Sequence, residues 1–176
     1  MRDETEFTEF ATASAPRLYR SALLLCGDPH LAEDLVQETL ARVYVRMHRT
    51  LGRIDASRID ASRIDNLPAY AQTALVRIFI SSRRRRSSGE IAVDAVPEVR
   101  LATADDALRL TLGAALAELA PLDRAVIVLR HLDDRSVAEV AIALGLSEGA
   151  VRNRSMRALD RLRERLGATL PELLIS

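Results

Sequence analysis

The sequence of 176 residues contains no Trp, no Lys, a single Cys and only 3% aromatic residues, and these shortages exclude several classes of protein. The lone Cys26 cannot form a disulfide within the chain, so a disulfide-stabilised fold is excluded. No apolar run approaches the roughly 18 to 20 residues of a membrane-spanning helix, and the acidic N-terminus is unlike a signal peptide. A hydrophobic content of 48% excludes a disordered polymer. We therefore expect a cytoplasmic protein with no membrane insertion.

Residues that carry chemistry are equally scarce. The three His residues lie far apart, with no Cys or carboxylate at the spacing of a metal site. The sequence has no Gly-rich phosphate loop and no motif of an activated nucleophile. We therefore expect no metal, no cofactor and no enzymatic activity.

Charge and aromatic residues divide the chain into three parts. Residues 1–86 carry 14 Arg and 11 acidic residues, residues 87–106 carry 1 and 5, and residues 107–176 carry 10 and 9. All the aromatic residues precede position 80. The acidic stretch contains Gly, Pro and Ser without a sustained period, which is typical of a linker. We predict an all-α protein: two small helical domains, residues 1–86 and 107–176, with separate cores, joined by a flexible acidic linker over 87–106.

Three helical patterns precede the linker. The first covers about 6–25, and the second places one apolar stripe at steps of 4, 4, 3 and 4 between Ala32 and Met47. The third begins near Pro68 and ends in four consecutive arginines. Between the second and third, a five-residue unit recurs over 53–65. Because a period of five fits no secondary structure, we expect a lengthened loop there, and a functional role of the repeat is the alternative.

A helix-turn-helix is predicted after the linker. Ser136 and Glu139 have the spacing of a capping box, in which each side chain bonds the backbone N–H of the other. Gly145 ends this short helix, and Ser147 is placed to cap a second one. Two short helices joined by a three-residue turn form a helix-turn-helix, although a plain helical hairpin in a bundle has the same outline.

The outer face of the second helix favours DNA binding. Its apolar positions leave Gly149, Asn153 and Arg157 outward, and Arg152, Arg154 and Arg161 lie on the flanks. Arg forks and the Asn amide match purine edges in a major groove, and flanking arginines match phosphates.

Two further polar faces lie on the helices before the linker. Thr73, Arg77, Ser81 and Arg84 share the face opposite the apolar stripe of the third helix. Two basic surfaces separated by a linker indicate one protein that holds two DNA segments, although a basic helix end is often only solvated. On the second helix, Asp34, Gln37, Glu38 and Arg42 share a face. This face suits a basic protein partner, and a merely solvated face is the alternative.

Three motifs in this order resemble the extracytoplasmic function (ECF) sigma factors of bacterial RNA polymerase, in the sigma-70 family, and in particular their SigE-like actinobacterial branch. They are the stretch Ala-Glu-Asp-Leu-Val-Gln-Glu-Thr-Leu at 32–40, the Pro68-Ala-Tyr helix ending in arginines, and the helix-turn-helix ending in Arg-Ala-Leu-Asp-Arg-Leu-Arg at 157–163. The resemblance implies docking on the largest and second-largest subunits of the polymerase core, binding to promoter DNA, and control by an anti-sigma factor.

The resemblance also assigns residues to these partners. Polymerase docking would use Asp34, Leu35, Gln37 and Glu38. The −10 element would be bound by Thr73, Arg77, Ser81, Arg83 and Arg84. The −35 element would be bound by Ser147, Gly149, Arg152, Asn153, Arg154, Arg157 and Arg161. Arg77 departs from the family pattern, because many relatives have Asn there.

Two other functions compete with this interpretation. A stand-alone helix-turn-helix regulator accounts for residues 136–166 but not for the acidic face near Asp34, and it would bind DNA without polymerase. A helical scaffold predicts no affinity for DNA. Promoter-specific transcription with core polymerase distinguishes the three.

Overall fold

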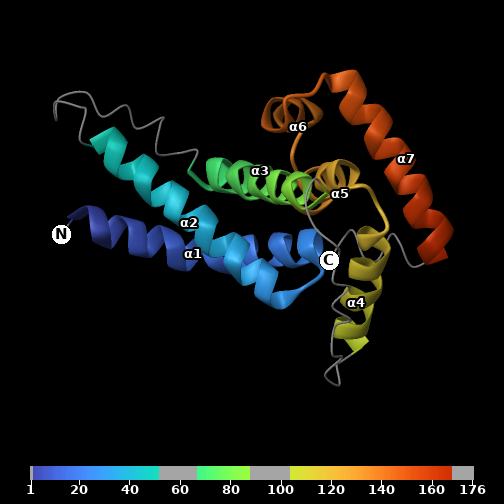
Figure 1. The fold of residues 1–176 in the computed structure, drawn as a ribbon, viewed down its shortest axis with the longest axis horizontal. Helices are drawn as coiled ribbons and strands as arrows, with labels where there is room; N and C mark the ends of the chain where they lie inside the picture. The colour runs from blue at the N-terminus through green and yellow to red at the C-terminus, as the bar shows by residue number, and fades with distance from the viewer. Residues whose placement is uncertain (1, 52–66, 88–103, 168–176) are drawn as a thin grey trace.

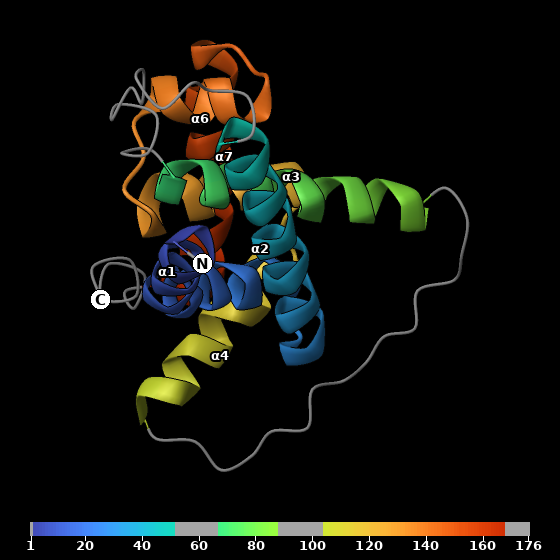
Figure 2. The same ribbon diagram turned by 90° about the vertical axis from the view of Figure 1, so that its left-hand side faces the viewer.

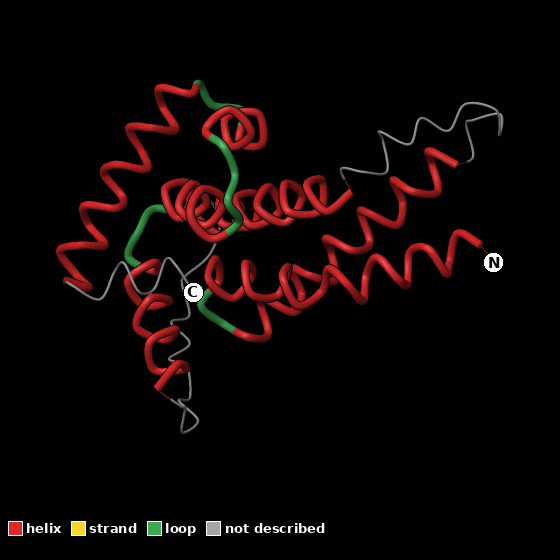
Figure 3. The backbone as a smooth tube through the Cα atoms, turned by 180° about the vertical axis from the view of Figure 1, so that it is seen from behind, coloured by secondary structure: helices red, strands yellow, loops and turns green. Residues whose placement is uncertain are grey.

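A computed structural model describes residues 2–51, 67–87 and 104–167, which contain helices and no strand (Figure 3). The elements in chain order are α1 (Arg2–Cys26), α2 (Pro29–Leu51), α3 (Leu67–Ser87), α4 (Ala104–Ala117), α5 (Pro121–Ile127), the π-helical turn η2 (Val128–Leu132), α6 (Val137–Leu144) and α7 (Glu148–Leu166). The all-α prediction is confirmed. Both ends of the expected linker are helical, because α3 reaches Ser87 and α4 begins at Ala104. The five-residue repeat lies outside the described residues.

Helices α1, α2 and α3 lie together (Figure 1), and their buried apolar side chains belong to one cluster. The chain turns between α1 and α2 at Gly27, whose φ of 72° favours glycine. The Asp28 carboxylate then accepts the backbone N–H of Leu31 at 2.8 Å and caps the start of α2. Along α2, Ala32 and Val43 are fully buried. Spacing in the sequence was therefore sufficient to predict this stripe.

The helix-turn-helix forms as its caps predict. Ser136 Oγ accepts the Glu139 N–H at 3.2 Å, and the Glu139 carboxylate accepts the Ser136 N–H at 2.8 Å. Gly145 ends α6 with φ 66° and ψ 38°, a left-handed conformation that favours glycine. Ser147 Oγ accepts the Ala150 N–H at 3.2 Å and starts α7. The predicted capping box and turn are confirmed.

One local difference follows α5. The chain does not continue as a regular α-helix there but widens into the π-helical turn η2. The N–H of Asp133 bonds the carbonyl of Val128, five residues earlier, at 3.0 Å. Asp133 is only 5% exposed, so the chain buries a carboxylate immediately after the widened turn.

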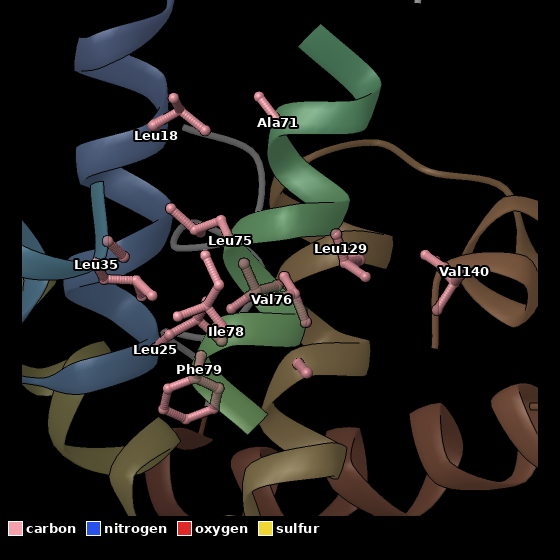
Figure 4. Close-up of a cluster of buried hydrophobic side chains, with 14 of the residues drawn as sticks. Leu18, Leu25, Leu35, Ala71, Leu75, Val76, Ile78, Phe79, Leu129 and Val140 are labelled. Carbon is pink, nitrogen blue, oxygen red and sulfur yellow. The ribbon is translucent and has the colours of Figure 1, made fainter. Parts of the chain in front are cut away.

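The prediction of two separate cores is wrong. One buried cluster contains residues of α1, α2 and α3 together with residues of α5, η2, α6 and α7. Figure 4 shows the reason: Leu18 and Leu25 lie on one side of α3, and Leu129 and Val140 lie on the other. Helix α3 contributes to both sides because Leu75 and Val76, which are neighbours on the helix and point in different directions, are both fully buried. A helix that is apolar around most of its circumference is buried by neighbours on several sides.

The buried residues of a smaller second cluster all come from the later helices, and Leu24 of α1 packs against them. The cluster joins α4, α5 and α7 through residues that include Leu112, Leu116, Ile127 and Leu162. Helix α7 runs from α6 back to α4, as Figure 1 shows. Figures 1 and 2 both show α6 on the side of α3 opposite to α1. Helix α3 therefore lies between the N-terminal helices and the helix-turn-helix.

Candidate nucleic-acid interface

The outer face of α7 is arranged as the sequence predicts. Val151, Ala158 and Leu162 face inward and are 0%, 1% and 1% exposed. The predicted −35 residues Ser147, Gly149, Arg152, Asn153, Arg157 and Arg161 are exposed. The geometry is that of an exposed helix face rich in donors, which suits a DNA groove.

Two arginines on this face make exposed contacts within α7. Arg152 pairs with Glu148 at 2.6 Å, and both side chains are at least half exposed. Arg157 Nε donates to the carbonyl of Asn153 at 3.3 Å. Exposed contacts of this kind contribute little free energy, so DNA can replace them at low cost.

Arg154 differs from the other predicted −35 residues. Its guanidinium pairs with the Asp123 carboxylate of α5 at 2.6 Å, and the two side chains are only 31% and 16% exposed. This contact fixes α7 against α5. The sequence analysis missed it because Asp123 lies 31 residues earlier in the chain. Arg154 is half-buried here and not part of the exposed face.

Some residues of the predicted −10 face of α3 already contact other groups of the protein. Arg77, Ser81 and Arg84 are exposed, whereas Thr73 is half-buried and donates to the carbonyl of Ala69 at 2.9 Å. The half-buried Arg83 lies over the Phe79 ring, 5.7 Å from its centroid.

Arg77 reaches beyond its own helix to the helix-turn-helix. Its Nε donates to the carbonyl of Ala143 at 2.7 Å, and a second nitrogen donates to that of Ile142 at 3.2 Å. Both acceptors belong to the last turn of α6, where carbonyls lack partners within the helix. Spacing in the sequence could not indicate a contact between residues so far apart.

The acidic face of α2 is present, with one correction. Asp34, Gln37 and Glu38 are exposed, and Glu38 pairs with Arg42 at 2.8 Å. Leu35, which the resemblance placed with them, is 6% exposed and belongs to the core. The buried stripe of α2 is wider than the sequence analysis assumed, and Leu35 lies within it.

Arg124 is a buried charge that the sequence analysis did not identify. It is 5% exposed and donates to the carbonyls of Leu25 and Ala117, both at 2.6 Å, and of Leu119 at 3.2 Å. Burial lowers the pKa of Arg124 to about 10, which leaves it charged at neutral pH. The side chain therefore joins the ends of α1 and α4 to α5.

The described residues were also considered for a metal site and for a membrane-spanning helix. Within residues 2–51, 67–87 and 104–167, no three His, Cys, Asp or Glu residues gather as metal ligands would. His131 Nε2 lies 3.1 Å from Ser155 Oγ of α7, and burial lowers the pKa of this His. None of the helices in that part of the chain has the length and apolar character needed to cross a membrane.

Comparison with known proteins gives two family matches, in the same order as the two polar regions. Residues 10–89 match sigma-70 region 2, and residues 109–162 match sigma-70 region 4. The chain is 37% identical to the RNA polymerase sigma-E factor of Streptomyces coelicolor, over 96% of this chain and 90% of that protein. It is 34% identical to the ECF RNA polymerase sigma factor SigL of Mycobacterium tuberculosis, over 86% and 85%.

A solved structure shares the fold. The sigma factor RpoE of Bartonella quintana, crystallised in complex with the anti-sigma factor NepR, superposes with a TM-score of 0.68 at 25% identity. The match covers 93% of this chain and 98% of that chain. The likeness therefore extends over both halves of the molecule.

Proposed function

Because the chain belongs to the ECF group of the sigma-70 family, we propose that its two polar regions bind the two elements of a promoter while its acidic face binds polymerase. The protein is a sigma factor that directs promoter recognition by RNA polymerase, and it is not an enzyme. We assign polymerase docking and the −10 element to residues 1–86 and the −35 element to residues 107–176.

The −35 element is assigned to α7, and the exposed donor-rich face of this helix carries the proposal. Asn153 and Arg157 are outward near the middle of the face and would contact base edges. Arg152 and Arg161 would contact phosphates, which position the helix without reading sequence. Gly149 has open space around it, so the backbone of the first turn can approach DNA closely.

The −10 element is assigned to the face of α3 that carries Thr73, Arg77, Ser81, Arg83 and Arg84. Arg77 and Arg84 supply positive charge, and Ser81 supplies a small polar side chain between them. Arginine is suited to this task because its planar fork bonds phosphates and base edges and stays charged at every physiological pH.

Polymerase docking is assigned to Asp34, Gln37 and Glu38, and Leu35 is left out because it is buried. Their carboxylates would be repelled by DNA and attracted by a basic protein surface, which we place on the largest polymerase subunit. The sigma factor would act in the cytoplasm, where polymerase and chromosome meet. An anti-sigma partner is supported by the related structure, which was solved with one bound.

Run-off transcription tests the function. The protein is mixed with bacterial core polymerase and a genomic DNA library, and the start sites are aligned. We expect two shared elements about 35 and 10 base pairs upstream of the start, since the two assigned surfaces hold two DNA segments. A stand-alone regulator would instead bind its own site without core enzyme and would yield no aligned start sites.

A further inference from the structure

Two polar contacts hold α7 against the segment that precedes the helix-turn-helix. The Arg154 guanidinium pairs with the Asp123 carboxylate of α5 at 2.6 Å. Ser155 Oγ lies 3.1 Å from Nε2 of His131, which belongs to η2. The Asp123 side chain is 16% exposed, and Ser155 is buried. We call these four residues, which form two contacts with consecutive positions of α7, the α7 anchor.

The α7 anchor fixes the rotation of the helix about its own axis. Consecutive residues of an α-helix point about 100° apart, so Arg154 and Ser155 bond partners in two different directions at nearly the same height. The other inward residues of α7 include Val151, Ala158 and Leu162, whose apolar contacts have no preferred direction. A small rotation that these apolar contacts tolerate would lengthen both polar contacts. The two polar contacts therefore select one rotation.

The π-helical turn places His131 against α7. In this turn the N–H of Asp133 bonds the carbonyl of Val128, five residues earlier. Such a turn holds more residues than an α-helical turn, so each side chain advances by a smaller angle than in α5. Burial lowers the pKa of His131, so the ring is neutral at physiological pH and has one donor and one acceptor nitrogen. The Ser155 hydroxyl thereby has a polar partner within an otherwise apolar stripe.

The α7 anchor lies behind the residues that are assigned to base edges. Asn153 directly precedes Arg154, and Arg157 follows Ser155 by two positions. Asn153 and Arg157 are exposed on the side of α7 opposite to Ser155. A side chain that binds a specific partner must be held within about 0.5 Å and 10–20° of its productive position. The rotation of α7 therefore decides which base edges these two side chains reach.

We propose that Asp123 and His131 are positioning residues for the −35 element, which set its base preference without contacting DNA. They act by fixing the rotation of α7 through Arg154 and Ser155. This role rests on the proposed function of α7. It differs from a purely stabilising role, in which the two contacts would raise the free energy of unfolding while base preference would not depend on them.

The first test measures base preference with holoenzyme assembled from core polymerase and the full-length protein. The −35 element found by aligning start sites competes with its single-base variants for binding. His131→Phe keeps an aromatic ring and removes both ring nitrogens. We expect the preference for the element to fall several-fold and the affinity for DNA without the element to stay unchanged, because phosphate contacts carry no sequence information. His131→Gln retains an amide that can bond Ser155 and should restore most of the preference.

A second variant covers the case in which His131→Phe fails to fold. Asp123→Ala removes the partner of Arg154, whose side chain is 31% exposed and can be solvated. We expect the same several-fold loss of preference. Its matched control is Glu118→Ala, which removes an exposed ion pair between α4 and Arg165 in the last turn of α7 and should keep the wild-type preference. Lower thermal stability with wild-type base preference in both anchor variants would refute the positioning role.

The second test measures the rotation of α7 in the full-length protein alone. Spin labels are placed on Ala114→Cys of α4 and Met156→Cys of α7 in a Cys26→Ser background, because both labelled positions are exposed. The distance distribution from electron–electron resonance should broaden in His131→Phe and Asp123→Ala and return to the wild-type width in His131→Gln.

The outcomes of the second test separate the anchor from the proposed function. Unchanged distributions in both anchor variants would show that the two contacts do not fix α7. Broadened distributions with unchanged base preference would also overturn the positioning role. If the wild-type holoenzyme yields no aligned start sites, the proposed function fails, and the distance distributions still decide whether the α7 anchor fixes the helix.

Discussion

The helices before the linker and those after it are stabilised in different ways. Helices α1, α2 and α3 contain 25, 23 and 21 residues and bury long stripes against one another. Helices α5 and α6 contain 7 and 8 residues; α6 has a capping box, α5 has no side-chain cap, and both belong to the cluster that includes α3. Isolated helices this short are unstable in water. The later half is therefore ordered partly by the earlier half, and α3 is the element that both share.

The largest expected effect is a loss of polymerase binding, assigned to the first half, without a loss of DNA binding by the second half. Asp34→Arg combined with Glu38→Arg should abolish core polymerase binding, because both residues are exposed and the reversal turns attraction into repulsion. Binding of the −35 element by α7 should persist. Co-purification with core enzyme measures the first effect and DNA binding measures the second.

The matched control is Glu9→Arg with Glu164→Arg, which makes the same charge change at exposed positions outside the proposed face. Retained polymerase binding by the Asp34/Glu38 variant, with an unchanged helical spectrum, would refute the docking assignment.

Removing a large side chain from the shared helix should destabilise both halves. Phe79 is 1% exposed, and Phe79→Ala should lower the free energy of unfolding by about 3–5 kcal/mol. Because α3 contacts both halves, amide exchange should accelerate in α1, α5 and α6 alike. Leu162→Ala, in the smaller cluster, should cost about 2–5 kcal/mol and accelerate exchange mainly in α4 and α7. Effects of Phe79→Ala confined to α1, α2 and α3 would contradict the shared core.

Arg157→Ala tests the DNA-reading assignment of the later half. If Arg157 bonds a guanine, its loss should weaken binding to the −35 element by about 1–3 kcal/mol and relax base preference at one position. The fold should be unaffected, because the side chain is exposed and bonds only within α7. Fluorescence anisotropy against a panel of single-base variants measures both effects. Arg163→Ala, which removes an exposed ion pair with Asp160, is the control. Equal weakening on every sequence would indicate a phosphate contact instead.

Removing helix caps tests, with a smaller effect, whether the short helices after the linker depend on their caps more than the long helices before it. Ser136→Ala removes half of the capping box and should lower the free energy of unfolding by about 0.5–2 kcal/mol. Asp28→Ala removes a cap from the much longer α2 and should cost a similar amount. We expect faster amide exchange across all of α6 in the first variant, but only in the first turn of α2 in the second. If amide exchange accelerated over the same number of residues in α6 and in α2, helix length would not explain the different stability of the two halves.

The smallest expected effect is a pH dependence of stability. Burial raises the pKa of Asp133, so the folded protein binds this proton more tightly than the unfolded chain. The contribution of Asp133 therefore favours folding below its ordinary pKa of 3.8 and is lost as pH rises through the raised value. The charges that act on this carboxylate are Arg17 and Arg135. Asp133→Asn should remove this component from the free energy of unfolding measured between pH 4 and 8, and an identical pH profile would contradict it.

The helices and the exposed faces were predictable because they depend on neighbours in the sequence. The stripe of α2 and the capping box at Ser136 need only spacings of three or four residues. The inward residues of α7 followed from the same periodicity, and so did the outward Asn153 and Arg157. The binding partner of each face was predicted from the family resemblance, because periodicity indicates only which residues are exposed.

Contacts between distant residues were decided by the tertiary structure. Val76 is buried on a second side of α3, Arg154 pairs with Asp123, and Gln72 donates to Asp133. No local pattern in the sequence relates the partners in these contacts. The sequence by itself determined which residues form helices and which face of each is polar, because backbone hydrogen bonds and side-chain periodicity act over one or two turns. Only the tertiary structure decided that the two halves share a core and that Arg77 bonds α6, because these depend on how whole helices pack.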